Sequence, residues 1–198
     1  MTFKLLSRLA GAIALTVGLA GCMDVTMEMD ILSETTGKAT TTSVMAADVY
    51  AMMKAGASSE DNSEGFCDET GATLTENADG SATCVIIAEG AFDKLANAGT
   101  NDGAKFEVVS PGVVKVSFST AEMKGQVGAD DSQDEETKAM MKQFFEGHAI
   151  TLRIKGKEVL DTNMTKTANG AEVVIPFLDL INGTADLPPE LFATVKVN

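Results

Sequence analysis

The sequence predicts an α+β fold: a largely antiparallel sheet made of hairpins, with two helices, at about residues 46–55 and 134–146, packed on it. Most of the chain alternates apolar and polar residues with period two, which is typical of half-buried strands. Two turn signals, at residues 77–80 and at Pro111-Gly112, join strands into hairpins. The two helical segments instead space their apolar residues three and four positions apart.

The predicted domain begins with two strands and a helix. Residues 24–31 alternate apolar and polar side chains, which indicates a half-buried strand. The sequence TTGK at 35–38 predicts a turn, and the Thr-rich residues 39–45 return as a second strand. Residues 46–55 contain no β-branched run, and their apolar positions follow helical spacing. These positions are Val49, Met52 and Met53.

Two short strands flank residues 77–80 (NADG). A turn centred on Asp79-Gly80 would place Cys84 opposite Thr75. The second of these strands, at 82–89, is almost continuously apolar, so we expect it near the centre of the sheet.

The middle of the chain continues with a possible helical turn at 91–99 and a hairpin at 105–119. The helix at 134–146 has acidic residues near its N-terminus, which suit the helix dipole, and ends at Gly147. Its apolar face consists of Met140, Met141, Phe144 and Phe145.

The C-terminal part returns to strands. We expect them at 148–156, 157–165 and 171–180, and a last strand at 191–197 after the breaker LPPE.

The first 22 residues predict a bacterial lipoprotein signal. Lys4 and Arg8 form a basic start, and the apolar run 9–20 is too short to cross a membrane but suits a secretory signal. The run ends in Leu-Ala-Gly-Cys, which resembles the lipobox, where the cysteine is acylated and the chain is cut before it. We therefore expect a signal peptide at 1–21 and a single periplasmic domain at 22–198, tethered to the membrane through acyl groups on Cys22. Met23 after the cysteine permits transfer to the outer membrane by the enteric sorting rule, and the sequence leaves inner or outer membrane open.

The composition and charge of the chain limit the classes of partner that it could bind. Cleavage before Cys22 would leave 177 of the 198 residues and, by removing Lys4 and Arg8, change the formal charge from −14 to −16. A chain of this length normally folds as one domain. Its negative charge argues against nucleic-acid binding and against lying flat on anionic lipid.

Cys67 and Cys84 are the remaining cysteines. In an oxidising compartment two such thiols usually pair, so we predict a disulfide between them. Two reduced structural thiols are the alternative.

The order of elements resembles that of LppM-type domains in bacterial envelope lipoproteins. The lipobox is followed by an alternating strand, a turn and a Thr-rich strand, and the C-terminal part contains GKEVLDTN at 156–163, which resembles the GKVxxTN turn-strand motif of these domains. The matching residues are Gly156, Lys157, Val159, Thr162 and Asn163. The resemblance implies a membrane-tethered α+β domain, for which lipid binding is suggested in some members, and implies no catalytic residues.

No motif predicts an enzyme or a cofactor. The sequence lacks GxSxG, SxxK, P-loop and GxGxxG patterns. The single histidine, His148, is expected at the start of a strand with a local hydrogen bond. Acids at 130–136 lack EF-hand spacing, and the methionines that suggest a Cu(I) site follow strand and helix spacing as a core does.

We therefore expect a non-enzymatic envelope protein that binds lipid or another envelope component. A lipid would lie in a cleft between the sheet and the 134–146 helix, lined by Met140, Met141, Phe144 and Phe145, and outward-facing Arg153 and Lys155 could meet an anionic headgroup. The alternative is a structural or assembly partner of an envelope protein complex without a small-molecule ligand. A hydrolase using two carboxylates is a third, weaker hypothesis.

Overall fold

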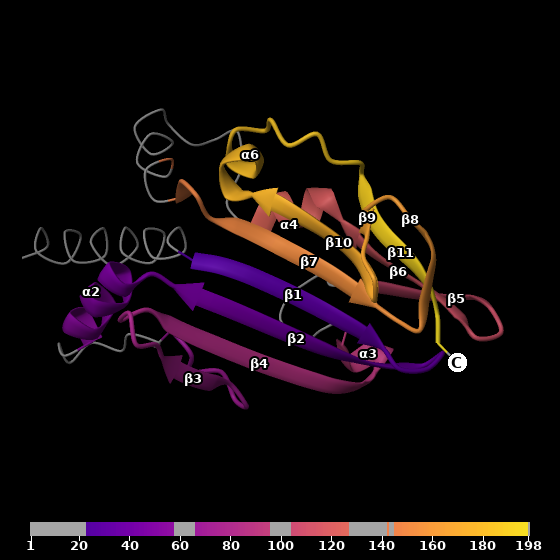
Figure 1. Ribbon diagram of the computed structural model, residues 1–198, viewed down its shortest axis with the longest axis horizontal. Coiled ribbons are helices and arrows are strands. Elements are labelled where there is room, and N and C mark those ends of the chain that lie inside the picture. Colours follow the sequence, from indigo (N-terminus) through magenta and orange to yellow (C-terminus); the bar gives the residue numbers. More distant parts are fainter. Residues whose placement is uncertain (1–22, 58–65, 96–103, 127–141, 143–144, 198) are drawn as a thin grey trace, which may run out of the picture.

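A computed structural model describes residues 23–57, 66–95, 104–126, 142 and 145–197. These residues form two β-sheets and several short helices (Figure 1). All described strand pairs except one are antiparallel, so the α+β class and the largely antiparallel pairing are confirmed. The prediction of one sheet is wrong, because the strands divide into a seven-stranded and a four-stranded sheet.

The larger sheet has the order β3-β4-β2-β1-β7-β10-β9. Its strands are β1 (Met23–Ile31), β2 (Thr36–Met45), β3 (Thr73–Glu76), β4 (Ala82–Ala91), β7 (Ala149–Lys155), β9 (Thr165–Lys166) and β10 (Gly170–Pro176). At its centre β1 runs antiparallel to β2 but parallel to β7. A parallel pair cannot be joined by a tight turn. After β2, β3 and β4 have added to the same sheet, the chain therefore leaves it before β7, and part of this connection joins the second sheet.

The smaller sheet has the order β5-β6-β11-β8. Its strands are β5 (Lys105–Ser110), β6 (Val113–Ser119), β8 (Glu158–Thr162) and β11 (Glu190–Lys196). The predicted turn at Pro111-Gly112 is confirmed, with Ser110 opposite Val113 and Gly112 at a φ of 75°. After β7 the chain alternates between the sheets, because β8 and β11 belong to the smaller one and β9 and β10 to the larger one.

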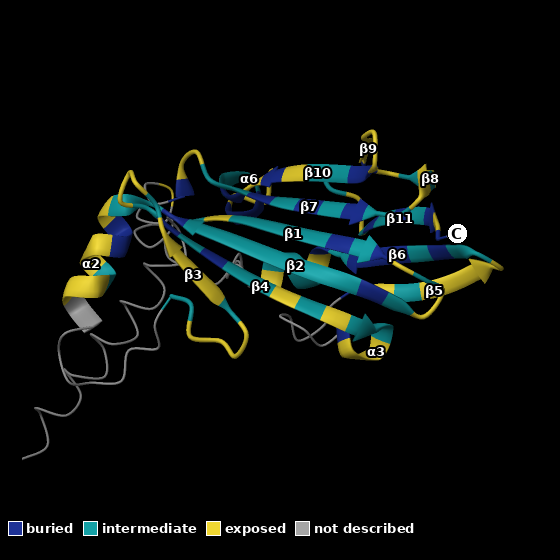
Figure 2. Cartoon of the chain, turned by 60° about the horizontal axis from the view of Figure 1, so that its bottom comes forward, coloured by how far each residue is buried: buried dark blue, intermediate teal, exposed yellow. Residues whose placement is uncertain are grey.

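The core lies between the two sheets. Ile150, Leu152 and Ile154 occupy one face of β7 and are at most 8% exposed. Val116 of β6 and Val195 of β11 are fully buried in the same cluster. One face of the larger sheet is therefore covered by the smaller sheet, whereas its other face, called here the outer face, carries the partly exposed and exposed residues (Figure 2).

The predicted helix at 46–55 is confirmed as α2 (Ala47–Ala57). Its buried residues Val49 and Tyr50 pack with Met45 and Ala82 in a second, smaller cluster. Figures 1 and 2 place α2 at the end of the molecule where β1 begins. Most of the second predicted helix, at 134–146, lies outside the described residues.

Three further helices are short: α3 (Phe92–Leu95), α4 (Thr120–Gln126) and α6 (Phe177–Ile181). Helix α3 falls within the helical turn predicted at 91–99, whereas helix α4 was not expected. The third corrects the strand predicted at 171–180. Pro176 has no N–H with which to extend the strand ladder, and the buried Phe177, Leu180 and Ile181 recur at helical spacing.

The hairpin at 77–80 differs from the prediction by one residue. Cys84 lies opposite Leu74 rather than Thr75. The N–H of Gly80 donates to the carbonyl of Asn77 and that of Asn77 to Ser81, with Gly80 at a φ of 87°. The loop therefore has three residues and ends in a left-handed glycine, instead of the two-residue loop that was assumed.

Candidate functional site

The predicted acylation site lies just before the first strand. Cys22 and the signal at 1–21 are outside the described residues, and Met23 is the first residue of β1. Among the described residues, no helix has the length and apolar character needed to cross a membrane. The tether at Cys22 stays a prediction.

The predicted disulfide is confirmed. Cys67 and Cys84 are bonded, with their Cα atoms 5.6 Å apart. Cys84 is buried on the inner side of β4, whereas Cys67 is half-buried in the segment after α2. The neighbouring Phe66 packs edge-on against Tyr50, with ring centroids 6.3 Å apart. The bond thus holds this segment and α2 against the end of the larger sheet.

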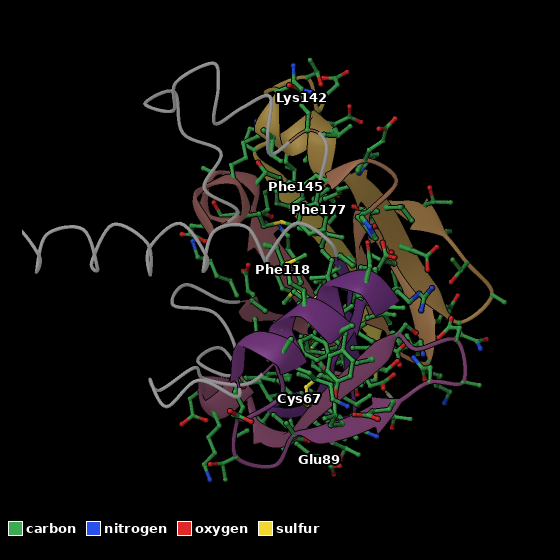
Figure 3. The ribbon with its side chains drawn as sticks, turned by 90° about the vertical axis from the view of Figure 1, so that its left-hand side faces the viewer. Cys67, Glu89, Phe118, Lys142, Phe145 and Phe177 are labelled. Carbon is green, nitrogen blue, oxygen red and sulfur yellow. A yellow bond between two sulfur atoms is a disulfide. The ribbon has the colours of Figure 1, made fainter. Side chains whose placement is uncertain are left out.

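Of the residues predicted to line a lipid cleft, the structure describes one. Met140, Met141 and Phe144 lie outside the described residues. Phe145 is 3% exposed, and its ring lies 5.0 Å from that of Phe177 (Figure 3). Phe145 is therefore a core residue, and its role toward a ligand stays a prediction.

A small, partly open cavity lies between the sheets in the described part of the chain. Its volume is ≈ 20 Å³, and its lining includes Met27, Met29 and Phe118. That volume holds about one water molecule, whereas pockets for small-molecule ligands typically measure about 300–1,000 Å³. An acyl chain does not fit this cavity as it stands.

Arg153 and Lys155 point outward, as predicted, and lie on the outer face of β7. They are thus on the opposite side of the sheet from Phe145, so the structure does not bring the two groups of predicted ligand residues together. Arg153 forms an ion pair with Glu172 of β10, and Lys155 one with Glu28 of β1 at 2.5 Å. Both cations already have carboxylate partners, and their headgroup role stays a prediction.

An uncharged band crosses the outer face beside these ion pairs. Thr26 of β1 lies opposite Thr42 of β2 and next to Thr151 of β7. The row continues to Val85 on one side and Val174 on the other. We call these five residues the Thr/Val band. Val174 is 54% exposed, as is Ile87 on the adjacent row of β4.

Further exposed apolar residues lie on strands at the sheet edges. They are Leu74 on β3, Val108 and Val109 on β5, and Leu160 on β8. Edge strands offer unpaired backbone groups, so these positions are also possible contact sites.

A polar network joins α2 to the edge strand β3. Oε1 of Glu76 accepts hydrogen bonds from the Tyr50 hydroxyl at 2.8 Å and the Lys54 ammonium at 2.7 Å. These bonds lower the pKa of Glu76, with the larger effect from Lys54. The bond to Glu76 raises the pKa of both Tyr50 and Lys54. The network fastens α2 to the sheet when Glu76 is ionised.

His148 lies just before β7, close to the start of β1. Its Nδ1 is 3.3 Å from Oδ2 of Asp24, and Oδ1 of Asp24 accepts a hydrogen bond from the N–H of Ala149 at 3.0 Å. The carbonyl of His148 accepts one from Phe177. His148 thus lies at a strand end, as expected, but its Nδ1 makes no hydrogen bond within the described residues, so the expected side-chain hydrogen bond is not found.

The described residues show no cluster of histidine, cysteine and acidic side chains that could hold a metal ion. The acids at 130–136 lie outside this part of the chain. Met29 is buried in the main core, as its strand spacing predicted, and Met45 is buried in the second cluster. The core position predicted for Met52 from its helix spacing is wrong, because its side chain is 64% exposed.

The residues of the GKVxxTN motif join β8 to β11. Oγ1 of Thr162 donates to the carbonyl of Phe192 at 2.6 Å. The Asn163 amide donates to the carbonyl of Glu190 at 2.7 Å and accepts from the N–H of Phe192 at 2.9 Å. A Cβ at Gly156 would lie 2.8 Å from Val195. The motif thus has a structural role at the corner where the chain changes sheets.

No family model matches this chain, and no curated protein sequence matches it either. Among solved structures, the chain is similar to the NMR structure of the folded domain of LppM from Mycobacterium tuberculosis. The TM-score is 0.43 and the identity is 9%, over 88% of this chain and 90% of that chain. This neighbour is of the type that the sequence resembles, and membership of that family stays a prediction.

Proposed function

We propose that this chain is a lipid-anchored envelope protein, held on the periplasmic side of a membrane through Cys22, that binds another envelope protein without catalysing a reaction. The lipobox sequence and the predicted signal support the anchor. The disulfide between Cys67 and Cys84 is consistent with maturation in an oxidising compartment.

The observation that carries the binding role is the Thr/Val band. It crosses five neighbouring strands without a charge, although 22% of the residues of the chain are charged. The ion pairs of Arg153 and Lys155 border it on one side. Protein interfaces are typically depleted in charge at their centre and polar at their rim. Figure 1 shows the outer face toward the viewer, with the smaller sheet behind it.

A protein partner is favoured over a buried lipid because the cavity found between the sheets is small. The cavity of ≈ 20 Å³ leaves no room for an acyl chain. Lipid binding in a cleft next to the 134–146 segment is the second candidate, and the buried Phe145 beside Phe177 is the observation that favours it.

Native mass spectrometry distinguishes the two candidates. The chain is expressed with its own signal, extracted from its envelope in mild detergent and measured intact. We expect residues 22–198 with covalent acyl groups, and a larger species containing a second protein. The variant Thr42→Arg should abolish this larger species, whereas the matched variant Val109→Arg, on the edge strand β5, should retain it.

Three outcomes would contradict this proposal. A stoichiometric non-covalent lipid adduct without a second protein would favour the lipid-binding candidate. An unmodified Cys22 would remove the anchor. Equal loss of the larger species in both variants would show that the Thr/Val band is not the contact surface.

A further inference from the structure

A single peptide bond separates the predicted acylation site from the folded domain. β1 begins at Met23, the residue after Cys22. Consecutive Cα atoms are about 3.8 Å apart. Acylation of Cys22 would therefore hold the start of β1 within a few ångströms of the lipid headgroups, with no linker through which the domain could move away from the membrane.

Helix α2 begins close to the same point. Met23 pairs with Met45, and α2 starts two residues later at Ala47. From the usual spacing of paired strands and consecutive residues, its first Cα lies within about 17 Å of that of Cys22. In Figures 1 and 2, α2 lies beyond the start of β1, on the side away from the rest of the strands. Of the helices and strands that the structure describes, α2 would be the first to meet a membrane at the anchor.

The side of α2 that faces away from the sheet carries three exposed apolar residues beside the exposed, charged Asp48 and Lys54. Val49 and Tyr50 are buried against the sheet, whereas Ala51, Met52 and Ala55 are exposed. We call these three exposed residues the α2 patch. Met52 is 64% exposed, the highest value among the exposed large apolar side chains of the described residues. Its flexible side chain suits an irregular apolar surrounding such as the boundary between headgroups and acyl chains.

We infer that the α2 patch rests in the headgroup region of the phospholipid bilayer that holds the acyl groups, so that the domain stands end-on upon the membrane. This inference rests on the proposed anchor at Cys22. The nine residues of β1 then extend about 27 Å away from the membrane surface. The turn between β5 and β6, at the opposite end of the molecule in Figures 1 and 2, points away from the bilayer and the Thr/Val band lies between the two ends.

Charge indicates which lipids suit this contact. Asp24, Asp48, Glu76 and Asp79 lie at this end and are exposed or partly exposed, and Lys54 is already paired with Glu76. Anionic headgroups would repel these carboxylates. The surface therefore fits a bilayer of zwitterionic phospholipid better than an anionic one. Figure 3 views the molecule from this end, with α2 in front.

The absence of tryptophan from the sequence makes the test direct, because each introduced tryptophan is the only one in the chain. Three single variants are prepared from the full acylated chain: Met52→Trp in the α2 patch, Ile87→Trp on the outer face, and Val109→Trp near the distant turn. All three replace side chains that are at least 49% exposed, so folding should be retained. Each is placed in phosphatidylcholine vesicles with or without bromine atoms on the lipid near the headgroup.

We expect bromine to remove about half of the Met52→Trp fluorescence, because an interfacial helix lies within about 5–10 Å of the acyl boundary. The other two variants should lose less than about a tenth, since their positions lie beyond that depth. Adding anionic phosphatidylglycerol should reduce the difference at low salt. In the unsubstituted chain, amide exchange of α2 should be slower on vesicles than in a Cys22→Ala chain, which excludes an effect of tryptophan itself.

Two negative results have different meanings. If the mass of the purified chain shows no acyl groups on Cys22, both the anchor of the proposed function and this orientation are wrong. If Cys22 is acylated but bromine quenches Met52→Trp no more than Val109→Trp, the orientation alone is wrong and the anchor stands.

Discussion

Removing the disulfide should destabilise the domain by an amount that follows from the loop it closes. Cys67 and Cys84 are 17 positions apart. The chain-entropy model assigns about 3 kcal/mol to the closure of a loop of this size. Cys67 is the better position for the test, because it is half-buried, whereas Cys84 is 3% exposed and its truncation would add the cost of a cavity.

The assay is thermal unfolding of Cys67→Ala and of the unchanged chain, each with and without a reducing agent. For a domain of this size, 1 kcal/mol shifts the midpoint by about 2–4 °C, so the variant should melt about 6–12 °C lower. The reductant should lower the midpoint of the unchanged chain to that of the variant and leave the variant unaffected. The reasoning would be refuted if the variant had the same thermal midpoint as the oxidised unchanged chain, or if the reductant shifted the midpoints of both proteins equally.

Three further predictions concern packing, pH and the sheet corner. Gly170→Ala should lower the unfolding free energy in urea, because its Cβ would collide with the carbonyl oxygen of Ile154. The control Gly125→Ala in α4 meets no atom within 4 Å and should leave the unfolding free energy unchanged or raise it by up to about 1 kcal/mol. Glu76→Gln should lower the thermal midpoint at neutral pH. The folded-state pKa of Glu76 lies below its ordinary value because Lys54 and Tyr50 donate hydrogen bonds to it, so its contribution is present above the ordinary pKa and lost as the pH falls through the folded pKa. The thermal midpoints of the two proteins should therefore converge as the pH is lowered, and a constant difference would contradict this. Asn163→Ala leaves two backbone partners on β11 unpaired and should lower the unfolding free energy, measured by urea titration, by about 1–2 kcal/mol. An unchanged unfolding midpoint would exclude a role for the motif in joining the sheets.

Local patterns in the sequence predicted most of the strands and the first helix. The alternation in residues 24–31 identified β1 and the side that it buries, because successive side chains of a strand point to opposite faces. The helical spacing of residues 46–55 identified α2. The turn at Pro111-Gly112 predicted the β5–β6 hairpin, since its signal is contained within a few residues.

Errors arose where a local signal had two interpretations. The apolar run through Pro176 suited a strand throughout, and only its packing shows that Phe177 begins a helix. The sequence NADG marked a hairpin correctly, but two- and three-residue loops both accept an Asp-Gly pair. The choice between them shifts the register by one residue and moves the partner of Cys84.

The candidate surfaces depended most on tertiary structure. Alternation placed Arg153 and Lys155 on an outward face, but their partners Glu172 and Glu28 come from strands that the sequence does not place beside β7. The Thr/Val band likewise combines single residues from five strands. No individual strand shows it as a motif.

The sequence by itself predicted most of the strands, the apolar side of each and the disulfide between its two domain cysteines, and the anchor at Cys22 stays a prediction from it. These properties depend on neighbouring residues or on composition. Tertiary structure alone decided that β1 pairs in parallel with β7 and that the strands divide into two sheets. Alternation of apolar and polar residues indicates that one face of a strand is buried, but not which element covers that face. The pairing of distant segments depends on the packing of the whole core.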